Sequence, residues 1–244
     1  MAIMKTTESK LIFCNFDGSG IMGLEWAKAG HKVICFNADD ADHGTYKKYN
    51  TRFEHPNLTY VNAWIDLDWL ERAMDLEWGK PDMIFAFPSC SNLAVSGAAH
   101  FERKRKTLGP LIQHRDVRAA KITAYLGEWL GVPYMIENPV SVISSMWRKP
   151  DYMFHPWEYG GYLPEDDIHP TFPEYIAARD MYPKKTCLWT GQGFIMPEKK
   201  PIPINKGYSK QHSKLGGKGT RTKTIRSLTP RGFAKAVFEA NKDL

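Results

Sequence analysis

The chain has 244 residues, of which 43% are apolar and 25% are charged, a composition typical of a globular protein. Lysine and arginine outnumber the acidic residues by 33 to 27, which gives a formal net charge of +6. These values exclude collagen-like, disordered and disulfide-stapled classes. No apolar run approaches the roughly 18 residues of a membrane span, so we expect no membrane partner. The four cysteines lie far apart and form no CxxC pair, so we expect a cytoplasmic protein.

Strand and helix signals alternate through the N-terminal two thirds of the chain. This alternation predicts an α/β fold, with a mostly parallel sheet and helices on both of its faces. Short apolar runs predict strands at Lys10–Phe16, Lys32–Phe36, Leu58–Val61, Asp82–Phe87 and Tyr134–Ile136. Apolar residues at helical spacing predict helices at Ile21–Ala29, Asp66–Trp78 and Gln113–Leu130, with a short one at Tyr46–Phe53.

The remainder of the chain is less regular, and we expect it to belong to the same single domain, 1–244. Residues of about 140–183 are rich in aromatic side chains, proline and glycine, which predicts an ordered but irregular insertion packed on the core. Thr186–Trp189 is a further strand candidate. Residues 199–226 hold nine lysines and arginines and no acid, which predicts a basic, glycine-bearing loop. Thr229–Asn241 is expected to form the closing helix.

Glycines mark the turn between the first predicted strand and the first predicted helix. Gly18 and Gly20 allow a tight turn and let a ligand approach the backbone near the free N–H groups of the helix. About twenty residues further on, where an acid usually holds a pair of ribose hydroxyls, the sequence offers Asp39 or Asp40. Dinucleotide and S-adenosylmethionine binders share this spacing. It therefore predicts a nucleoside ligand, with an ordinary tight turn as the alternative.

Two reactive side chains follow the fourth and fifth predicted strands. Cys90 lies in a loop restrained by Pro88, where a thiolate would be the strongest nucleophile of the chain. Glu137 is expected at the same edge of the sheet, where apolar packing raises the pKa of a carboxyl group and lets it donate a proton. A half-buried loop cysteine and a solvated glutamate are the alternatives. The cysteines and histidines show no metal-ligand spacing, so we expect no metal.

In their order along the chain, these features resemble the DNA cytosine-5 methyltransferase family, and more closely its compact bacteriophage form. Phe16–Gly20 (FDGSG) looks like the cofactor motif of that family, Phe87–Cys90 (FPSC) like its nucleophile loop and Glu137–Pro139 (ENP) like its E-N-V element. Tyr182–Lys185 takes the place of its Q-x-R-x-R element, and Ser227–Pro230 resembles its closing motif.

The chain departs from the family pattern at three places. Ser89 stands where the family usually has a proline, and Lys184 and Lys185 stand in place of arginines. The segment between Thr190 and Ser227 is too short for the usual target-recognition domain. We therefore expect low sequence specificity, or recognition built from short loops.

The resemblance implies a Rossmann-like methyltransferase fold and methylation of cytosine C5 in DNA, in the cytoplasm of a bacterial host if the chain is phage-encoded. Cys90 would attack C6 of a flipped base while Glu137 holds or protonates N3. Asn138 would orient the glutamate, and Lys185 or Lys184 would hold the base or its phosphate. The implied cofactor, S-adenosyl-L-methionine, would be bound by Phe16, Asp17, Gly18, Gly20, Asn37, Asp39, Asp66 and Pro88.

Basic stretches predict DNA as the partner of a monomer or weak dimer. His100–Lys106 follows the Cys90 loop, and the 199–226 segment is basic along its whole length, which suits phosphate contacts. Solvated charged loops are the alternative. The expected DNA-contacting residues are Ser91, Arg103, Lys104, Arg105, Lys184, Lys218, Arg221, Lys223 and Arg226.

Two other functions stay open from the sequence. An amino-methyltransferase acting on adenine N6 or cytosine N4 requires an Asp/Asn/Ser-Pro-Pro-aromatic loop after the fourth strand, and residues 86–90 match it only at Pro88. A non-catalytic relative would bind DNA and mask sites, which Ser89 and the missing recognition domain would permit. RNA and free nucleotide are also open as substrates.

Overall fold

The computed structural model describes residues 8–40, 45–204, 211, 214–215 and 219–244. These residues form a seven-stranded sheet in the order β3-β2-β1-β4-β5-β7-β6. The first five strands are parallel, and β7 runs antiparallel to both β5 and β6. The strands are β1 (Leu11–Asn15), β2 (Lys32–Asn37), β3 (Leu58–Asn62), β4 (Met83–Ala86), β5 (Tyr134–Pro139), β6 (Tyr152–Phe154) and β7 (Thr186–Gly191).

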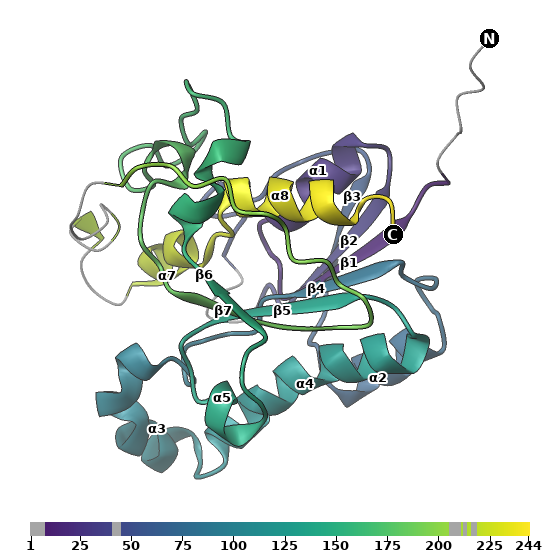
Figure 1. Ribbon diagram of the computed structural model, residues 1–244. Coiled ribbons are helices and arrows are strands. Elements are labelled where there is room, and N and C mark those ends of the chain that lie inside the picture. The colour runs from purple at the N-terminus through teal and green to yellow at the C-terminus, as the bar shows by residue number, and fades with distance from the viewer. Residues whose placement is uncertain (1–7, 41–44, 205–210, 212–213, 216–218) are drawn as a thin grey trace.

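Helices cover both faces of the sheet, so the predicted fold class is confirmed (Figure 1). On one face lie α1 (Ile21–Lys28) and α8 (Arg231–Asn241), and on the other lie α2 (Leu67–Met74) and α4 (Ile112–Leu130). The other helices are α3 (Phe101–Leu108), α5 (Ile143–Met146), α7 (Thr220–Ser227) and the 3-10 helices Val95–His100, Pro156–Tyr162 and Ala178–Asp180. None of the helices in the described ranges has the length and hydrophobicity that crossing a bilayer requires.

Side chains alternate between two cores along the central strands. In β1, Ile12 and Cys14 belong to the core under α1 and α8, whereas Phe13 belongs to the core under α2 and α4. In β4, Phe85 belongs to the core under α1 and α8, and Ala86 belongs to the core under α2 and α4. Because these strands are buried on both faces, they appear in the sequence as continuous apolar runs, which is why their positions could be predicted.

The helix predicted at Tyr46–Phe53 is wrong. Residues 46–50 form a turn, and the chain then runs without regular structure to β3. Asn50 has a positive φ of 53°, which an α-helix does not accommodate. The segment instead packs on the glycine loop, where the Phe53 N–H donates a 2.8 Å hydrogen bond to the carbonyl of Ser19.

The Glu137–Pro139 element also differs from its prediction, because it lies within β5 instead of following it. The antiparallel strand β7 continues the pairing to the end of this element and places Leu188 opposite Glu137. This partner comes from about fifty residues further along the chain. A local apolar run therefore could not indicate the extension of the strand.

The irregular insertion contains more structure than its composition indicated, including α5, β6 and two of the 3-10 helices. Its aromatic residues serve packing. Phe154 stacks on Phe233 of α8 with 4.0 Å between ring centroids, and Tyr159 is fully buried beside them.

In the predicted basic loop, residues 220–226 belong to the helix α7, while residues 205–210, 212–213 and 216–218 lie outside the described residues.

Candidate active site at the carboxyl edge of the sheet

The strand order creates a topological switch point between β1 and β4. The chain builds outward from β1 to β3, returns to the centre and then builds outward in the other direction from β4 to β5. Ligands of open α/β sheets bind at such a point, outside the carboxyl ends of the strands. The Phe87 N–H donates a 3.0 Å hydrogen bond to the carbonyl of Asn15, so the loops that follow β1 and β4 begin side by side.

Asp17 organises the glycine loop from within. Its Oδ1 accepts hydrogen bonds from the N–H groups of Ser19 (2.9 Å) and Gly20 (2.8 Å) and from the Ser19 hydroxyl. Its Oδ2 is buried and has no hydrogen-bond partner among the described residues. Burial raises the pKa of Asp17, and these hydrogen bonds oppose the shift. Gly20 has a φ of +75°, the left-handed conformation that glycine favours, immediately before α1 begins.

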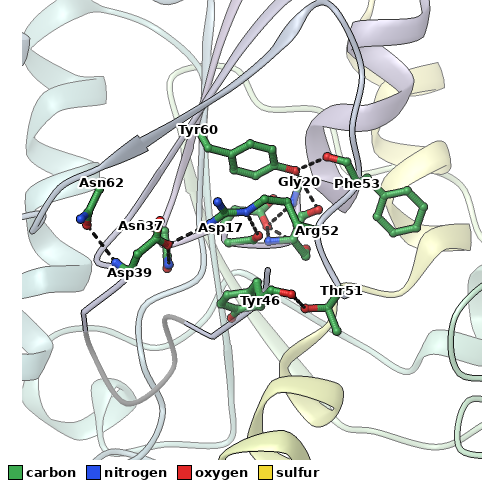
Figure 2. Close-up of polar contacts among 12 residues, drawn as sticks. Asp17, Gly20, Asn37, Asp39, Tyr46, Thr51, Arg52, Phe53, Tyr60 and Asn62 are labelled. Carbon is green, nitrogen blue, oxygen red and sulfur yellow. Dashed lines mark hydrogen bonds and ion pairs between the residues drawn. The ribbon is translucent and has the colours of Figure 1, made fainter. Parts of the chain in front are cut away.

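The segment before β3 covers this loop, as Figure 2 shows. The ring of Tyr46 lies so close to Gly18 that a Cβ at that position would overlap it. Arg52 donates from Nε to the carbonyl of Gly18 at 3.1 Å. Burial first, and then the charges of Asp17 and Cys90, raise the pKa of Tyr46 to about 12. Tyr46 therefore packs on the glycine loop, and its hydroxyl lies 3.2 Å from the Ser227 hydroxyl.

The predicted ribose-binding acid, Asp39, belongs to a polar network at the end of β2. Asn37 Nδ2 and the Arg52 guanidinium each donate a 2.9 Å hydrogen bond to its Oδ1, and its N–H donates to Asn62 Oδ1. Asp40 is exposed. The network identifies Asp39 as the acid that faces the glycine loop.

Asp66, one of the expected cofactor-binding residues, has a structural role that the prediction did not include. It is exposed, and its Oδ1 accepts a 3.1 Å hydrogen bond from the Trp69 N–H as the N-cap of α2. This capping bond accounts for an aspartate at that position without a ligand.

The second half of the site is a thiol beside a carboxyl group. Cys90 is half-buried in the loop after β4, and Glu137 lies on β5 with its Oε1 shielded from solvent. That oxygen has no hydrogen-bond partner among the described residues. Asn138 Nδ2 donates a 2.8 Å bond to the carbonyl of Pro88, which joins the two elements. Main-chain bonds from Val95 to Val140 and from Val142 to Leu93 continue this connection.

Lys184 supplies the positive charge near this pair. Burial raises the pKa of Cys90, the charge of Lys184 opposes that shift, and the charge of Glu137 adds to it. Burial likewise raises the pKa of Glu137, and Lys184 again opposes the shift. Lys185 is exposed, and its charge acts on Cys187 instead. The charge of Lys184 thus acts on both the thiol and the carboxyl group.

Basic residues from two helices surround the cysteine loop. Lys104 of α3 donates from Nζ to the carbonyl of Ser91, and burial followed by the charge of Lys223 lowers the pKa of Lys104. Arg103 and Arg105 on α3 and Arg221 on α7 are exposed.

Two further expected DNA contacts, Lys218 and Arg226, belong to the 199–226 segment. The guanidinium of Arg226 donates to the carbonyls of Leu215 at 2.7 Å and Gln211 at 3.3 Å, so it ties its own segment together. Lys218 lies outside the described residues.

Several residues of this edge carried no signal in the sequence. Tyr46 and Arg52 belong to no motif, and their contacts are made with loops far away in the chain. Cys14, Asp17 and Cys35 also come together, with ligand-type atoms within 4.8 Å of one another. Burial raises the pKa of both thiols, which favours the neutral form over the thiolate that a metal requires.

The fold and this edge define a Rossmann-like α/β protein with a glycine-rich loop after β1, a cysteine in the loop after β4 and a glutamate on β5. No protein-family model matches the chain, and no curated protein matches it. Among solved structures, the chain is similar to an E. coli protein described as a "putative DNA modification methyltransferase encoded within prophage". The similarity covers 81% of this chain and 52% of that one, with a TM-score of 0.46 and 13% sequence identity. The chain thus spans about half the length of that protein.

Proposed function

We propose that this chain is an S-adenosyl-L-methionine-dependent DNA cytosine-5 methyltransferase. The observation that carries the proposal is the Cys90–Glu137 pair, whose two segments the Asn138–Pro88 hydrogen bond connects at the carboxyl edge of the sheet. Cytosine C5 is a poor nucleophile, and its activation needs both a nucleophile for C6 and a proton donor for N3. Methylation of an exocyclic amino group needs no thiol, so the pair favours C5 as the target over N4 of cytosine or N6 of adenine.

The two groups would act in sequence on an extruded base. The Cys90 thiolate adds to C6, and the Glu137 carboxyl donates its proton to N3, so that the electron pair of the C5–C6 double bond becomes available at C5. C5 would then be methylated, which leaves the cofactor as its thioether. Loss of the C5 proton to a base would re-form the C5–C6 double bond and expel the Cys90 thiolate, and N3 would return its proton to the Glu137 carboxylate. The raised pKa of Glu137 suits it to carry that proton. Lys184 favours the thiolate, because its charge opposes the effect of burial on Cys90.

The residues of the glycine loop fit the proposed cofactor. Asp17 keeps a buried oxygen without a partner among the described residues, and both described hydrogen bonds to the Asp39 carboxylate use the same oxygen. A carboxylate oxygen of Asp39 thus stays available for a ribose hydroxyl. Phe16, Gly18 and Gly20 would complete the cradle. When bound, S-adenosyl-L-methionine supplies an electrophilic methyl group on a sulfonium sulfur.

DNA would reach this site between α3 and α7. Exposed Arg103, Arg105 and Arg221, together with Lys223, present positive charge on both sides of the cysteine loop. Contacts of this kind bind the phosphate backbone and carry little sequence information. We therefore also propose that the enzyme discriminates only weakly between DNA sequences.

Trapping with DNA that contains 5-fluorocytosine tests the mechanism directly. The C5 fluorine cannot leave as the proton does, so the covalent bond between Cys90 and C6 persists after methyl transfer. We expect an adduct that survives denaturation and maps to Cys90, is absent in Cys90→Ser and is retained in Cys187→Ala. Absence of an adduct and of tritiated-methyl incorporation across varied DNA would contradict the proposal.

A further inference from the structure

Arg52 is the side chain that links the glycine loop to the acid at the end of β2. Its Nε donates to the carbonyl of Gly18 at 3.1 Å, and its terminal nitrogen donates to Asp39 Oδ1 at 2.9 Å. The guanidinium also lies over the ring of Tyr60, with 4.1 Å to the ring centroid. Figure 2 shows Arg52 between these groups, with Asp39 on one side and the glycine loop on the other.

Arg52 is itself held in place from several directions. Only 14% of its side chain is exposed. Tyr60, whose ring packs against the guanidinium, donates from its hydroxyl to the carbonyls of Phe53 (2.5 Å) and Ser19 (3.1 Å). The adjacent Phe53 N–H bonds the same glycine loop. Arg52 therefore has little freedom to swing away.

The chemistry of a guanidinium suits this position. Its planar fork offers several N–H donors in fixed directions, so one side chain can hold two acceptors that belong to different strands. A lysine ammonium has no such fork and would reach one acceptor at a time in a defined geometry. The two acceptors here are a carbonyl of the loop after β1 and the carboxylate after β2.

We propose that Arg52 is a positioning residue for the ribose of the bound nucleoside. Together with Asn37, it occupies Oδ1 of Asp39 and so leaves the other carboxylate oxygen for a ribose hydroxyl. Through Gly18, it also fixes the separation between that oxygen and the glycine loop, which would hold the rest of the cofactor. This inference rests on the proposed nucleoside cofactor and deepens it, since it assigns a role to a residue outside every motif.

The test measures binding of S-adenosylhomocysteine by calorimetry, together with thermal unfolding. Arg52→Met should raise the Kd about tenfold or more, as expected when hydrogen bonds to a charged group are lost. Arg52→Lys, which keeps the charge and the packing against Tyr60, should recover part of the affinity and covers the case in which the methionine variant does not fold. The value of kcat at saturating cofactor should stay within about twofold of wild type, so that the loss appears in KM.

Arg72→Met is a matched control, because Arg72 also pairs with a carboxylate and lies over an aromatic ring, Trp78, away from the site. The Arg72→Met variant should leave the Kd unchanged.

If Arg52 acts through Asp39, substitution of Arg52 should cost little affinity in an Asp39→Asn background, since the two effects are then not additive.

The outcomes separate this inference from the proposed function. Wild-type protein that does not bind S-adenosylhomocysteine would overturn both. Wild-type binding together with an unchanged Kd in folded Arg52→Met and Arg52→Lys would overturn the role of Arg52 alone. Tighter binding by these variants would also overturn it, since Arg52 would then compete with the ribose for Asp39.

Discussion

The side-chain amide of Asn138 donates a 2.8 Å hydrogen bond to the main-chain carbonyl of Pro88. A residue of β5 thereby holds the loop that follows β4. Glu137 precedes the donor by one residue, and Cys90 follows the acceptor by two. This buried hydrogen bond, together with the main-chain bonds from Val95 to Val140 and from Val142 to Leu93, holds the two segments that carry the carboxyl group and the thiol.

Loss of this hydrogen bond should affect turnover more than cofactor binding. We expect Asn138→Ala to lower the free energy of unfolding by about 1–3 kcal/mol, because the Pro88 carbonyl loses its donor in a buried place. Steady-state methylation should fall at least about tenfold, because misplaced catalytic groups lower the rate of reaction. Asn92→Ala is a suitable control, since Asn92 Nδ2 donates a 2.8 Å hydrogen bond to Asp116 of α4 and not to the Pro88 carbonyl. Equal turnover in Asn138→Ala and wild type would contradict this prediction.

Glu137→Gln should separate proton donation from binding. The amide keeps the size of the side chain but cannot give its proton to N3, so we expect turnover to fall by about 100-fold or more. Binding of S-adenosylhomocysteine should not change. Glu158→Gln, which removes a carboxylate that bonds the His155 N–H and Lys199, should leave turnover near the wild-type value. The role assigned to Glu137 is wrong if its glutamine variant methylates DNA at the wild-type rate.

The reactivity of Cys90 should rise with pH through a thiol pKa above the ordinary value. Burial raises that pKa, so little thiolate is present near neutrality, and alkylation by iodoacetamide should accelerate as the pH increases. Lys184→Met removes the charge that opposes this shift, and the alkylation curve should therefore move to higher pH. Lys185→Met provides the control, because that neighbouring lysine is exposed and acts on Cys187. A shift in Lys185→Met of the same size would show that only the net charge matters.

The affinity for DNA should depend strongly on salt. Each phosphate contact that is lost lowers the slope of log K against log salt concentration by about 1, so Arg103→Ala and Arg105→Ala together should reduce it by about 2. Fluorescence anisotropy with duplexes of unrelated sequence would measure these slopes. Lys32→Ala, at the exposed amino end of β2 and so at the opposite edge of the sheet, should leave the slope unchanged. Identical slopes for the α3 variant and wild type would remove α3 from the proposed interface.

The central strands and main helices were predictable because their signals are local. Strands buried on both faces appear as short apolar runs, and α2 and α4 show their apolar residues at helical spacing. The false helix at Tyr46–Phe53 shows where such signals stop. That segment is shaped by hydrogen bonds to Ser19 and Gly18, more than thirty residues away, and its own sequence does not indicate them.

The sequence by itself determined the α/β class and the order of the glycine loop, the cysteine loop and the glutamate. It could do so because glycine, proline and reactive side chains mark loops within a few residues of each strand end. Only the tertiary structure decided that the charge of Lys184 acts on Cys90 while that of Lys185 acts on Cys187, and that Arg52 joins Gly18 to Asp39. The physical reason is that neighbouring residues can face opposite directions, and that ion pairs between loops depend on how distant strands are ordered in the sheet.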